Sequence, residues 1–244
     1  MTSVDALKRV KFNLWPNGVN KAVSLSYDDG DAADMRLAEL FDRYGMKATF
    51  HLVSAWIDEQ SRLTEAQVRE LSKRFEISAH MHTHPFPSEI PPMVAAEEIL
   101  ENKRRLEDMA GTVVRGMSYP YGQYDDAVVS LMRACGMEYS RTVQGNRGFY
   151  VPADFLRLHP TCHHNDIGDS WERFAAQKPD QRPLLYYLWG HSFEFVRQDN
   201  WNVIEDFCQK AGGHADMWYA TSIEVCEYIT AQRGLKCSAD LSRV

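Results

Sequence analysis

The sequence predicts an α/β fold whose parallel sheet is buried on both faces. Three observations predict this class. Short β-type runs alternate with helical patterns through most of the chain. The 244 residues, 44% of them hydrophobic, are enough for one substantial core. The 10 prolines and 14 glycines are scattered, and no linker, low-complexity run or internal repeat divides the chain. We therefore expect residues 1–244 to form a single domain with its core at about 20–232.

The first half of the chain contains the clearest alternation of strands and helices. Strands are expected at 22–27, 48–53, 75–79, 115–119 and 138–142, and helices at 32–44, 63–74, 94–109 and 125–135. Helix 32–44 has apolar residues at helical spacing, among them Leu37, Leu40 and Phe41, and Gly45 follows it as a stop signal. A Pro-Tyr-Gly turn at 120–122 ends strand 115–119.

The second half continues the same pattern. Strands are expected at 155–159, 184–189 and 217–220, and helices at 170–176, 203–211 and 222–232. Segment 184–189 is the most hydrophobic strand. Regular alternation of this kind builds either an open parallel sheet or a closed barrel, and in both cases catalytic groups gather at the C-terminal ends of the strands.

Composition excludes several classes of function. The formal charge of −7 and the pI near 5.7, with dispersed lysines and arginines, argue against nucleic acid as a partner. Residues 1–21 lack the apolar run of a signal peptide, and no stretch approaches the ~20 apolar residues of a membrane helix. We therefore expect a cytoplasmic protein that does not bind membranes.

The cysteines do not predict a disulfide framework or a cysteine zinc site. They are odd in number, widely spaced and without a C-x-x-C pair. We interpret all of them as reduced thiols, namely Cys135, Cys162, Cys208, Cys226 and Cys237.

Two adjacent carboxylates, Asp28 and Asp29, follow the hydrophobic strand 22–27, and Gly30 then allows the chain to turn from the strand into the following helix. Two unpaired acids at a strand end are unfavourable unless a positive group lies between them, and a metal ion would meet that need. The alternative interpretation is an Asp-Gly turn that caps the following helix.

Three histidines, His80, His82 and His84, follow the strand at 75–79. A histidine packed in a core usually stands alone, whereas neutral imidazoles are common ligands of zinc and related metals. If the chain turns directly after the strand, His80 and His84 converge and His82 points elsewhere. An aspartate with two histidines would leave coordination positions open, as catalytic sites do.

A further histidine, His191, comes directly after the most hydrophobic strand. A barrel places this strand end beside the end of the first strand, so His191 could face the metal without binding it and serve as a general acid. The alternative is a buried histidine that donates to a backbone carbonyl.

Together these motifs resemble the polysaccharide deacetylase family, also called NodB-homology or carbohydrate esterase family 4-like. Ser26-Tyr27-Asp28-Asp29-Gly30 resembles its Thr-Phe-Asp-Asp-Gly motif, and residues 76–85 are similar to its His-x-x-x-His metal motif. Residues 119–122 resemble its Pro-Tyr-Gly loop, and His191 occupies the place of its late histidine. The match runs in order from about residue 20 to 230.

The resemblance implies a deformed (β/α) barrel, TIM-barrel-like with about seven parallel strands, and hydrolysis of amide bonds other than peptide bonds. Carried over by position, Asp29, His80 and His84 would bind a divalent metal. Zinc is the default, although cobalt, nickel, manganese or iron also suits these ligands. Asp28 would be the general base, His191 the general acid, and the backbone N–H of Tyr121 a donor to the oxyanion.

The chain departs from the family pattern at Ser118, where the family has an arginine held against the catalytic aspartate. Arg115 is an odd number of residues away, on the opposite face of a strand, and is a poor substitute. Arg141, near the end of the next strand, is better placed, and we expect it to orient Asp28.

The family's acid that tunes the late histidine has no clear counterpart. Asp166, Asp169 and Glu194 are all candidates, and the sequence does not choose among them. His163 and His164 follow a predicted strand and either line the substrate pocket or belong to a polar loop.

Alternative functions remain open at this point. One is a metal-independent, allantoinase-type amidohydrolase. Another is a carbohydrate-binding protein without catalysis, with aromatic residues forming a stacking surface, namely Trp189, Trp201, Trp218 and Tyr121. We favour deacetylation of a small-molecule or oligosaccharide N-acyl substrate. A homo-oligomer is compatible with the helices expected on the outside, and the sequence gives no stoichiometry.

Overall fold

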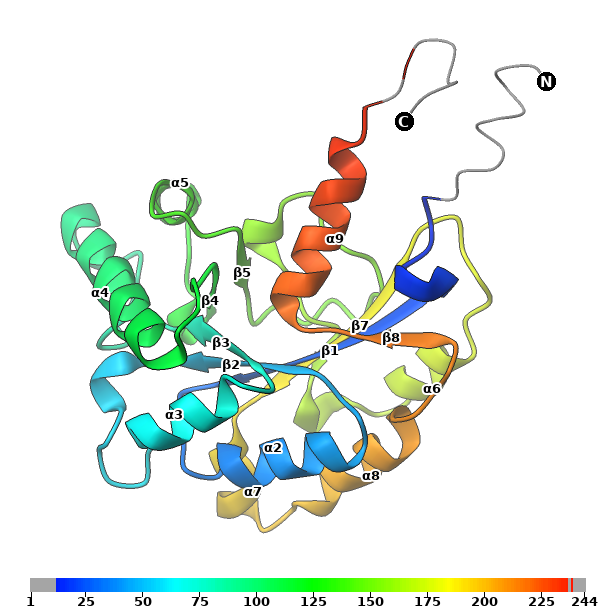
Figure 1. Cartoon of the computed structure of the whole chain (residues 1–244), viewed down its shortest axis with the longest axis horizontal. Coiled ribbons are helices and arrows are strands. Elements are labelled where there is room, and N and C mark those ends of the chain that lie inside the picture. The colour runs from blue at the N-terminus through cyan, green and yellow to red at the C-terminus, as the bar shows by residue number, and fades with distance from the viewer. Residues whose placement is uncertain (1–11, 237, 239–244) are drawn as a thin grey trace.

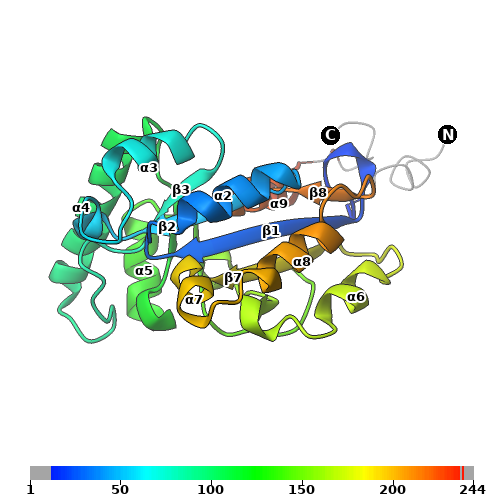
Figure 2. The ribbon, with the colours of Figure 1, turned by 90° about the horizontal axis from the view of Figure 1, so that it is seen from below.

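The computed structural model describes residues 12–236 and 238, and its centre is one curled parallel sheet surrounded by helices (Figures 1 and 2). The strands are β1 Lys21–Asp28, β2 Ala48–Leu52, β3 Glu76–Ala79, β4 Gly116–Ser118, β5 Tyr139–Arg141, β6 Cys162–His163, β7 Leu184–Gly190 and β8 Met217–Tyr219. Seven of them run in the order β5-β4-β3-β2-β1-β7-β6, and β8 pairs with β1. All strand pairs are parallel. The predicted deformed barrel of about seven parallel strands is confirmed.

Helices follow most strands and cover the outside of the sheet, as Figure 1 shows. They are α2 Asp34–Arg43, α3 Glu65–Leu71, α4 Pro92–Ala110, α5 Asp126–Ala134, α6 Ser170–Ala175, α7 Ser192–Gln198, α8 Asn202–Ala211 and α9 Ser222–Gly234. Local sequence fixes several ends. Thr64 and Thr221 begin α3 and α9 with capping boxes, and Gly111 ends α4 in the left-handed conformation.

The barrel is deformed because two strands share one edge of β1. The first residues of β1, from Lys21 to Val23, pair with β8, whereas Leu25 to Asp28 pair with β2. The whole opposite edge of β1 pairs with β7. Strand β1 therefore lies at the centre of the sheet and is buried along its full length.

The inside of the curled sheet is polar, and the apolar core lies between the sheet and the helices. On β1, Val23, Leu25 and Tyr27 belong to the main hydrophobic cluster. The alternate residues Ser24 and Ser26 are equally buried but polar, and they point to the other face. The sequence thus builds a polar interior that leads to the site at the strand ends.

Helix α9 closes the N-terminal end of this interior. Ser222 at its start donates its backbone N–H to Thr49 Oγ1 at 2.9 Å, and its hydroxyl lies 2.9 Å from Tyr187 Oη. The next residue, Ile223, donates its N–H to Glu76. The C-terminal ends of the strands are left as the open end of the barrel.

One predicted strand is wrong, and one strand and one α-helix of the structure were not predicted. Segment 155–159 contains a 3₁₀ helix, η4 Phe155–Arg157, because the Asp154 side chain caps Leu156 N–H at 3.0 Å. Only Leu158 makes a bridge, to Arg141 of β5. The strand in this region is the two-residue β6, and α7 was not expected from the sequence.

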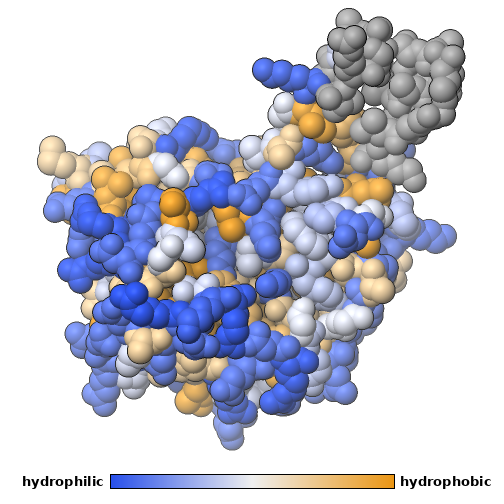
Figure 3. Space-filling view, in the orientation of Figure 1, coloured by the Kyte–Doolittle hydropathy of each residue, from blue (hydrophilic) through white to orange (hydrophobic). Residues whose placement is uncertain are grey.

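Several expectations from composition can be compared with the described residues. Cys135, Cys162, Cys208 and Cys226 are free thiols, as predicted, and Cys237 lies outside the described residues. No helix in the described part of the chain combines the length and apolarity that crossing a membrane requires. Hydrophobic residues are scattered among hydrophilic ones on the face shown in Figure 3. Residues 1–11, which belong to the segment 1–21 that we considered as a possible signal peptide, also lie outside the described part.

Candidate metal centre and catalytic groups

The residues singled out in the sequence meet at the C-terminal ends of neighbouring strands. Asp28 ends β1, His80 follows β3, and His191 follows β7. Ser118 of β4 pairs in register with Arg141 of β5. Since parallel strands all end at the same edge of a sheet, their terminal side chains converge there.

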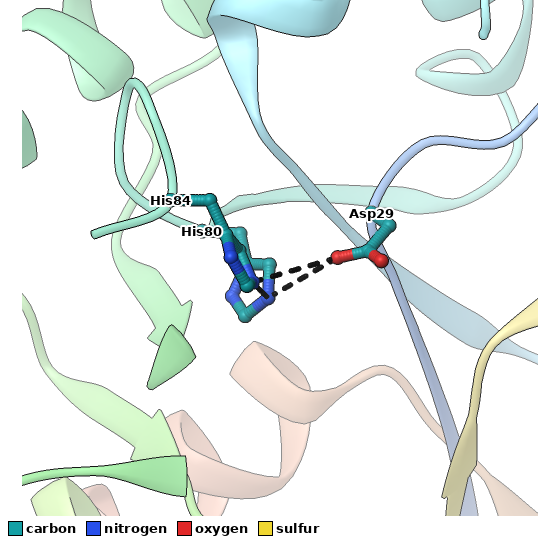
Figure 4. A group of neighbouring side chains, drawn as sticks. All are labelled: Asp29, His80 and His84. Atoms are coloured by element: carbon teal, nitrogen blue, oxygen red, sulfur yellow. Dashed lines mark hydrogen bonds and ion pairs between the residues drawn. The ribbon is translucent and has the colours of Figure 1, made fainter. Parts of the chain in front are cut away.

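Three of these side chains form a compact triangle, drawn in Figure 4. His84 Nε2 lies 3.0 Å from His80 Nε2. Asp29 Oδ1 lies 3.5 Å from His80 Nε2 and 3.7 Å from His84 Nε2. An ion with ligands at about 2.1 Å in tetrahedral geometry separates neighbouring ligand atoms by about 3.4 Å. The triangle therefore has the size of one face of such a coordination sphere.

The hydrogen bonds leave these atoms available as ligands. His80 Nδ1 lies 2.8 Å from the Ser118 carbonyl, which can only accept, so Nδ1 carries the proton and Nε2 keeps its lone pair. Burial, and then the neighbouring His80, lower the pKa of His84 to about 4, so its ring is neutral at pH 7. Among the described residues, the buried Asp29 Oδ1 has no hydrogen-bond partner.

The backbone is bent to bring these ligands together. Asp29, Met81 and His84 all have positive φ values, of 81°, 61° and 62°. Non-glycine residues rarely adopt this conformation, and each such residue costs about 1–3 kcal/mol. His82, between the two histidines of the triangle, instead lies 2.9 Å from Ser54 Oγ, so it points elsewhere as expected.

Asp28 lies next to the triangle, with Oδ2 at 3.9 Å from His80 Nε2, and forms a fully buried ion pair with Arg141. Burial raises the pKa of the Asp28 carboxyl, but the charge of Arg141, together with smaller contributions from His80, His51 and His191, outweighs burial and holds the pKa well below its usual range. The Arg141 guanidinium also stacks 4.3 Å above the Trp189 ring, and Ser118 Oγ donates to Asp28 Oδ1 at 3.2 Å. Arg115 forms a surface ion pair with Glu138 instead, as its position on the strand predicted.

His191 contacts one of the three candidate acids. Its Nδ1 lies 2.8 Å from Glu194 Oε1. Burial lowers the pKa of His191, but the bond to Glu194 and the negative charges of Asp28, Asp29 and Glu194 together outweigh burial, so the net shift of the pKa is upward. Asp166 is exposed at the end of η5, His164–Asp166, and Asp169 faces Arg173 on the surface.

Tyr121 occupies η3, Pro120–Gly122, with a positive φ of 57°. Its half-exposed ring stacks on Phe86 at 3.9 Å and meets the His84 ring at 4.5 Å. The Pro-Tyr-Gly loop therefore lies directly beside the triangle.

The four aromatic residues considered for a common stacking surface do not form one. Trp189 packs against Arg141, and Trp201 lines a cavity of about 760 Å³ beside Phe193. Trp218 contacts Trp15 in a separate hydrophobic cluster. The common stacking surface that the sequence left open as a possibility is not formed, because these tryptophans contact different parts of the chain.

One buried group at the site was missed. His51 of β2 is fully buried, pairs in register with Asp28, and accepts the Asp29 N–H at its carbonyl oxygen. Burial lowers the pKa of His51 to about 3. The signal was the alternation on β2, which puts Thr49 and His51 on the same face.

Comparison with known proteins identifies the family and agrees with the fold. Residues 16–140, just over half of the chain, match the family model described as polysaccharide deacetylase. The Bacillus subtilis (strain 168) protein YxkH, provisionally named a polysaccharide deacetylase, is 25% identical over 126 residues, which are 51% of this chain and 45% of YxkH. The match thus spans less than half of that relative.

Two solved structures show the same fold. A provisionally named polysaccharide deacetylase of Mycobacterium smegmatis superposes with a TM-score of 0.67 at 16% identity, over 92% of this chain and 95% of that one. The Streptococcus pyogenes deacetylase PplD, in complex with acetate, gives 0.53 at 21% identity, over 64% and 69%.

Proposed function

This chain belongs to the polysaccharide deacetylase family, and from that premise we propose that it is a divalent-metal-dependent hydrolase that removes an acyl group from an amide nitrogen. The observation that carries the proposal is the triangle of Asp29, His80 and His84 beside the buried pair of Asp28 and Arg141. A metal site with a base beside it is an arrangement that can activate a water molecule for hydrolysis.

The residues of the triangle fit a divalent ion. His80 Nε2, which keeps its lone pair, and His84 Nε2 lie 3.0 Å apart and face a buried carboxylate oxygen that has no hydrogen-bond partner in the described part of the chain. We propose that Asp29, His80 and His84 hold the ion, with zinc as the default for this nitrogen and oxygen set. When bound, such an ion lowers the pKa of a water molecule and polarises the acyl carbonyl.

The remaining groups move protons and stabilise charge. Asp28, kept ionised by Arg141, takes a proton from the attacking water while the oxygen of that water bonds to the acyl carbon. The Tyr121 backbone N–H donates to the carbonyl oxygen as it becomes negative. His191 gives its proton to the nitrogen as the C–N bond breaks, so a carboxylic acid and a neutral amine leave.

The substrate we propose is an N-acetylated sugar or a related small molecule. Phe193, whose ring lies 5.0 Å from that of His191, also lines a neighbouring cavity of about 760 Å³. The test is acetate release from N-acetylglucosamine and its oligosaccharides with zinc, cobalt, nickel, manganese or iron. Hydrolysis of ureides by the metal-free protein, with no acetate release, would favour the allantoinase-type alternative.

Replacing Arg141 with alanine is expected to lower kcat by about 10²-fold and to move the acidic limb of the kcat/KM profile to higher pH. The reason is that burial, which raises the pKa of Asp28, would then act without the charge that lowers it. Less of the base is ionised at low pH. Steady-state rates between pH 4 and 9 measure the shift.

The matched variants are Arg141→Lys, which keeps the charge and should restore part of the rate, and Arg115→Ala, which removes a partly exposed arginine that pairs with Glu138. An Arg141→Ala protein with unchanged turnover and pH profile would show that Arg141 does not act on Asp28.

A further inference from the structure

A cavity beside the candidate site is lined by arginines that have no acidic partner. Its volume is about 760 Å³, and its walls come mainly from the start of α2, from α7 and from Trp201 just before α8. These three helices lie together at the lower edge of the view in Figure 1, and α2 packs against the other two. We call this cavity the arginine pocket and define it by Arg36, Phe193, Arg197 and Trp201.

The two arginines of the pocket are held by aromatic rings instead of by acids. The Arg36 guanidinium lies 4.0 Å from the centre of the Trp201 ring, and the Arg197 guanidinium lies 4.3 Å from the centre of the Phe193 ring. In the described part of the chain, neither guanidinium forms a hydrogen bond or an ion pair. A guanidinium that stacks by its face keeps the N–H donors at its edge, so both arginines can still bind an oxyanion.

Two other surface arginines show the contrast. Arg43, about two turns after Arg36 on α2, pairs with Glu205, and Arg69 pairs with Glu65. The whole chain carries a formal charge of −7, so its overall field repels anions. Two unpaired guanidiniums in one cavity therefore create a local site for a negative group in a protein that is otherwise acidic.

Two acids also line the pocket, and both have local roles in the backbone. Asp31 Oδ1 accepts the Ala33 N–H at 3.0 Å, where the chain enters α2. Asp199 ends α7 with a positive φ of 50°, a conformation that aspartate adopts more readily than most residues. Within the described residues, neither carboxylate forms an ion pair with Arg36 or Arg197. The donors of both arginines thus remain available.

Two contacts connect the arginine pocket to the groups of the proposed mechanism. The Phe193 ring lies 5.0 Å from the ring of His191. Ser61 lines the pocket, and the next residue, Arg62, donates Nη1–H to the Asp29 carbonyl oxygen at 3.3 Å. Arg62 also has no ion pair in the part of the chain that the structure describes. The pocket and the metal triangle therefore adjoin each other.

We propose that the arginine pocket binds a phosphate group of the substrate, so that the protein acts on phosphorylated N-acyl sugars in preference to neutral ones. This inference rests on the proposed function, because it names the class of substrate for the same site. Phosphate is favoured over a carboxylate because its larger charge and its three oxygens can be shared by two guanidiniums. Trp201 is not left for stacking a sugar, because Arg36 covers its ring and Phe195 contacts the same ring at 5.2 Å.

The kinetic test compares acetate release from N-acetylglucosamine 6-phosphate, N-acetylglucosamine 1-phosphate and neutral N-acetylglucosamine. We expect one of the phosphorylated sugars to have a KM about 100-fold below that of the neutral sugar, which is about tenfold for each arginine. Arg36→Gln and Arg197→Gln should each raise this KM by about tenfold at unchanged kcat, because the phosphate contact is the same in the substrate and the transition state. The neutral sugar should be affected much less.

Arg43→Gln is the matched control for these variants. It removes an arginine from the same helix, but Arg43 pairs with Glu205 and lies outside the pocket. It should change the KM of neither kind of sugar. Equal KM values for all three sugars in the wild type, or an equal rise for phosphorylated and neutral sugars in Arg36→Gln and Arg197→Gln, would overturn the proposal.

Binding of the deacetylated products gives a readout that does not depend on turnover. In calorimetric titrations, glucosamine 6-phosphate or glucosamine 1-phosphate should bind the wild type more tightly than glucosamine does. The double variant Arg36→Gln/Arg197→Gln, whose metal triangle is unchanged, should lose this difference. Full retention of the difference would overturn the proposal, since the phosphate would then be bound by the metal.

The remaining outcomes separate the ligand classes and the two proposals. Tighter binding of muramic acid, which carries a carboxylate, or of inorganic phosphate alone would overturn the assignment to a sugar phosphate. Arginine-dependent binding of a phosphorylated sugar by a wild type that releases acetate from no amide would support the pocket and contradict the proposed function. Acetate release without any preference for phosphate would do the reverse.

Discussion

Replacing Asp28 with asparagine is expected to lower kcat by about 10³-fold, within the range that general bases contribute. Asparagine keeps the shape of the side chain but cannot accept the proton of the attacking water. It also leaves the buried Arg141 without its charge partner, which destabilises the fold by about 3–5 kcal/mol. Rates should therefore be measured well below the melting temperature, with circular dichroism to confirm that the variant is folded.

Asp34→Asn is the matched control for this experiment. Asp34 is also fully buried, but burial raises the pKa of its carboxyl well above the usual range, so its neutral form resembles asparagine closely. This variant should keep nearly full activity. Wild-type turnover in Asp28→Asn would contradict the role of Asp28 as base.

Replacing His84 with alanine is expected to lower kcat/KM by about 10²- to 10³-fold and to weaken metal binding. One of the three atoms in the triangle is lost, and a bound metal contributes several kcal/mol to stabilising the transition state. His82→Ala provides the comparison, because His82 lies two residues away and contacts Ser54 instead. Metal affinity is measured by titration after chelation, alongside the rates.

A His82→Ala protein that loses metal as completely as His84→Ala would show that the triangle is wrongly composed. Retention of both metal and activity in His84→Ala would have the same meaning.

Much of the fold followed from local signals in the sequence. Segment 22–27 was expected to be a strand and lies within β1, and Gly111 marks the end of α4. Segment 155–159 misled because its apolar residues resemble a strand, whereas the Asp154 cap winds it into a 3₁₀ helix. Strand β6 has only two residues, too few to show a period.

The candidate site was predictable where its residues are close in sequence and only partly predictable elsewhere. His80 and His84 follow a single strand, so one turn brings them together. The contact between Arg141 and Asp28 depends on the curl of the sheet, because β5 and β1 are not neighbours in the strand order. The sequence could suggest this contact only after a barrel fold was assumed. The choice of Glu194 needed α7, whose first turn brings it to His191.

The most direct test of the account is the metal content of the purified protein, prepared without a metal-binding tag and measured by elemental mass spectrometry. The comparison is the variant with Asp29→Ala, His80→Ala and His84→Ala together. The account predicts about one divalent ion per wild-type chain and none in the triple variant. No metal in the wild type after incubation with zinc, cobalt, nickel and manganese, or equal metal in both proteins, would contradict it.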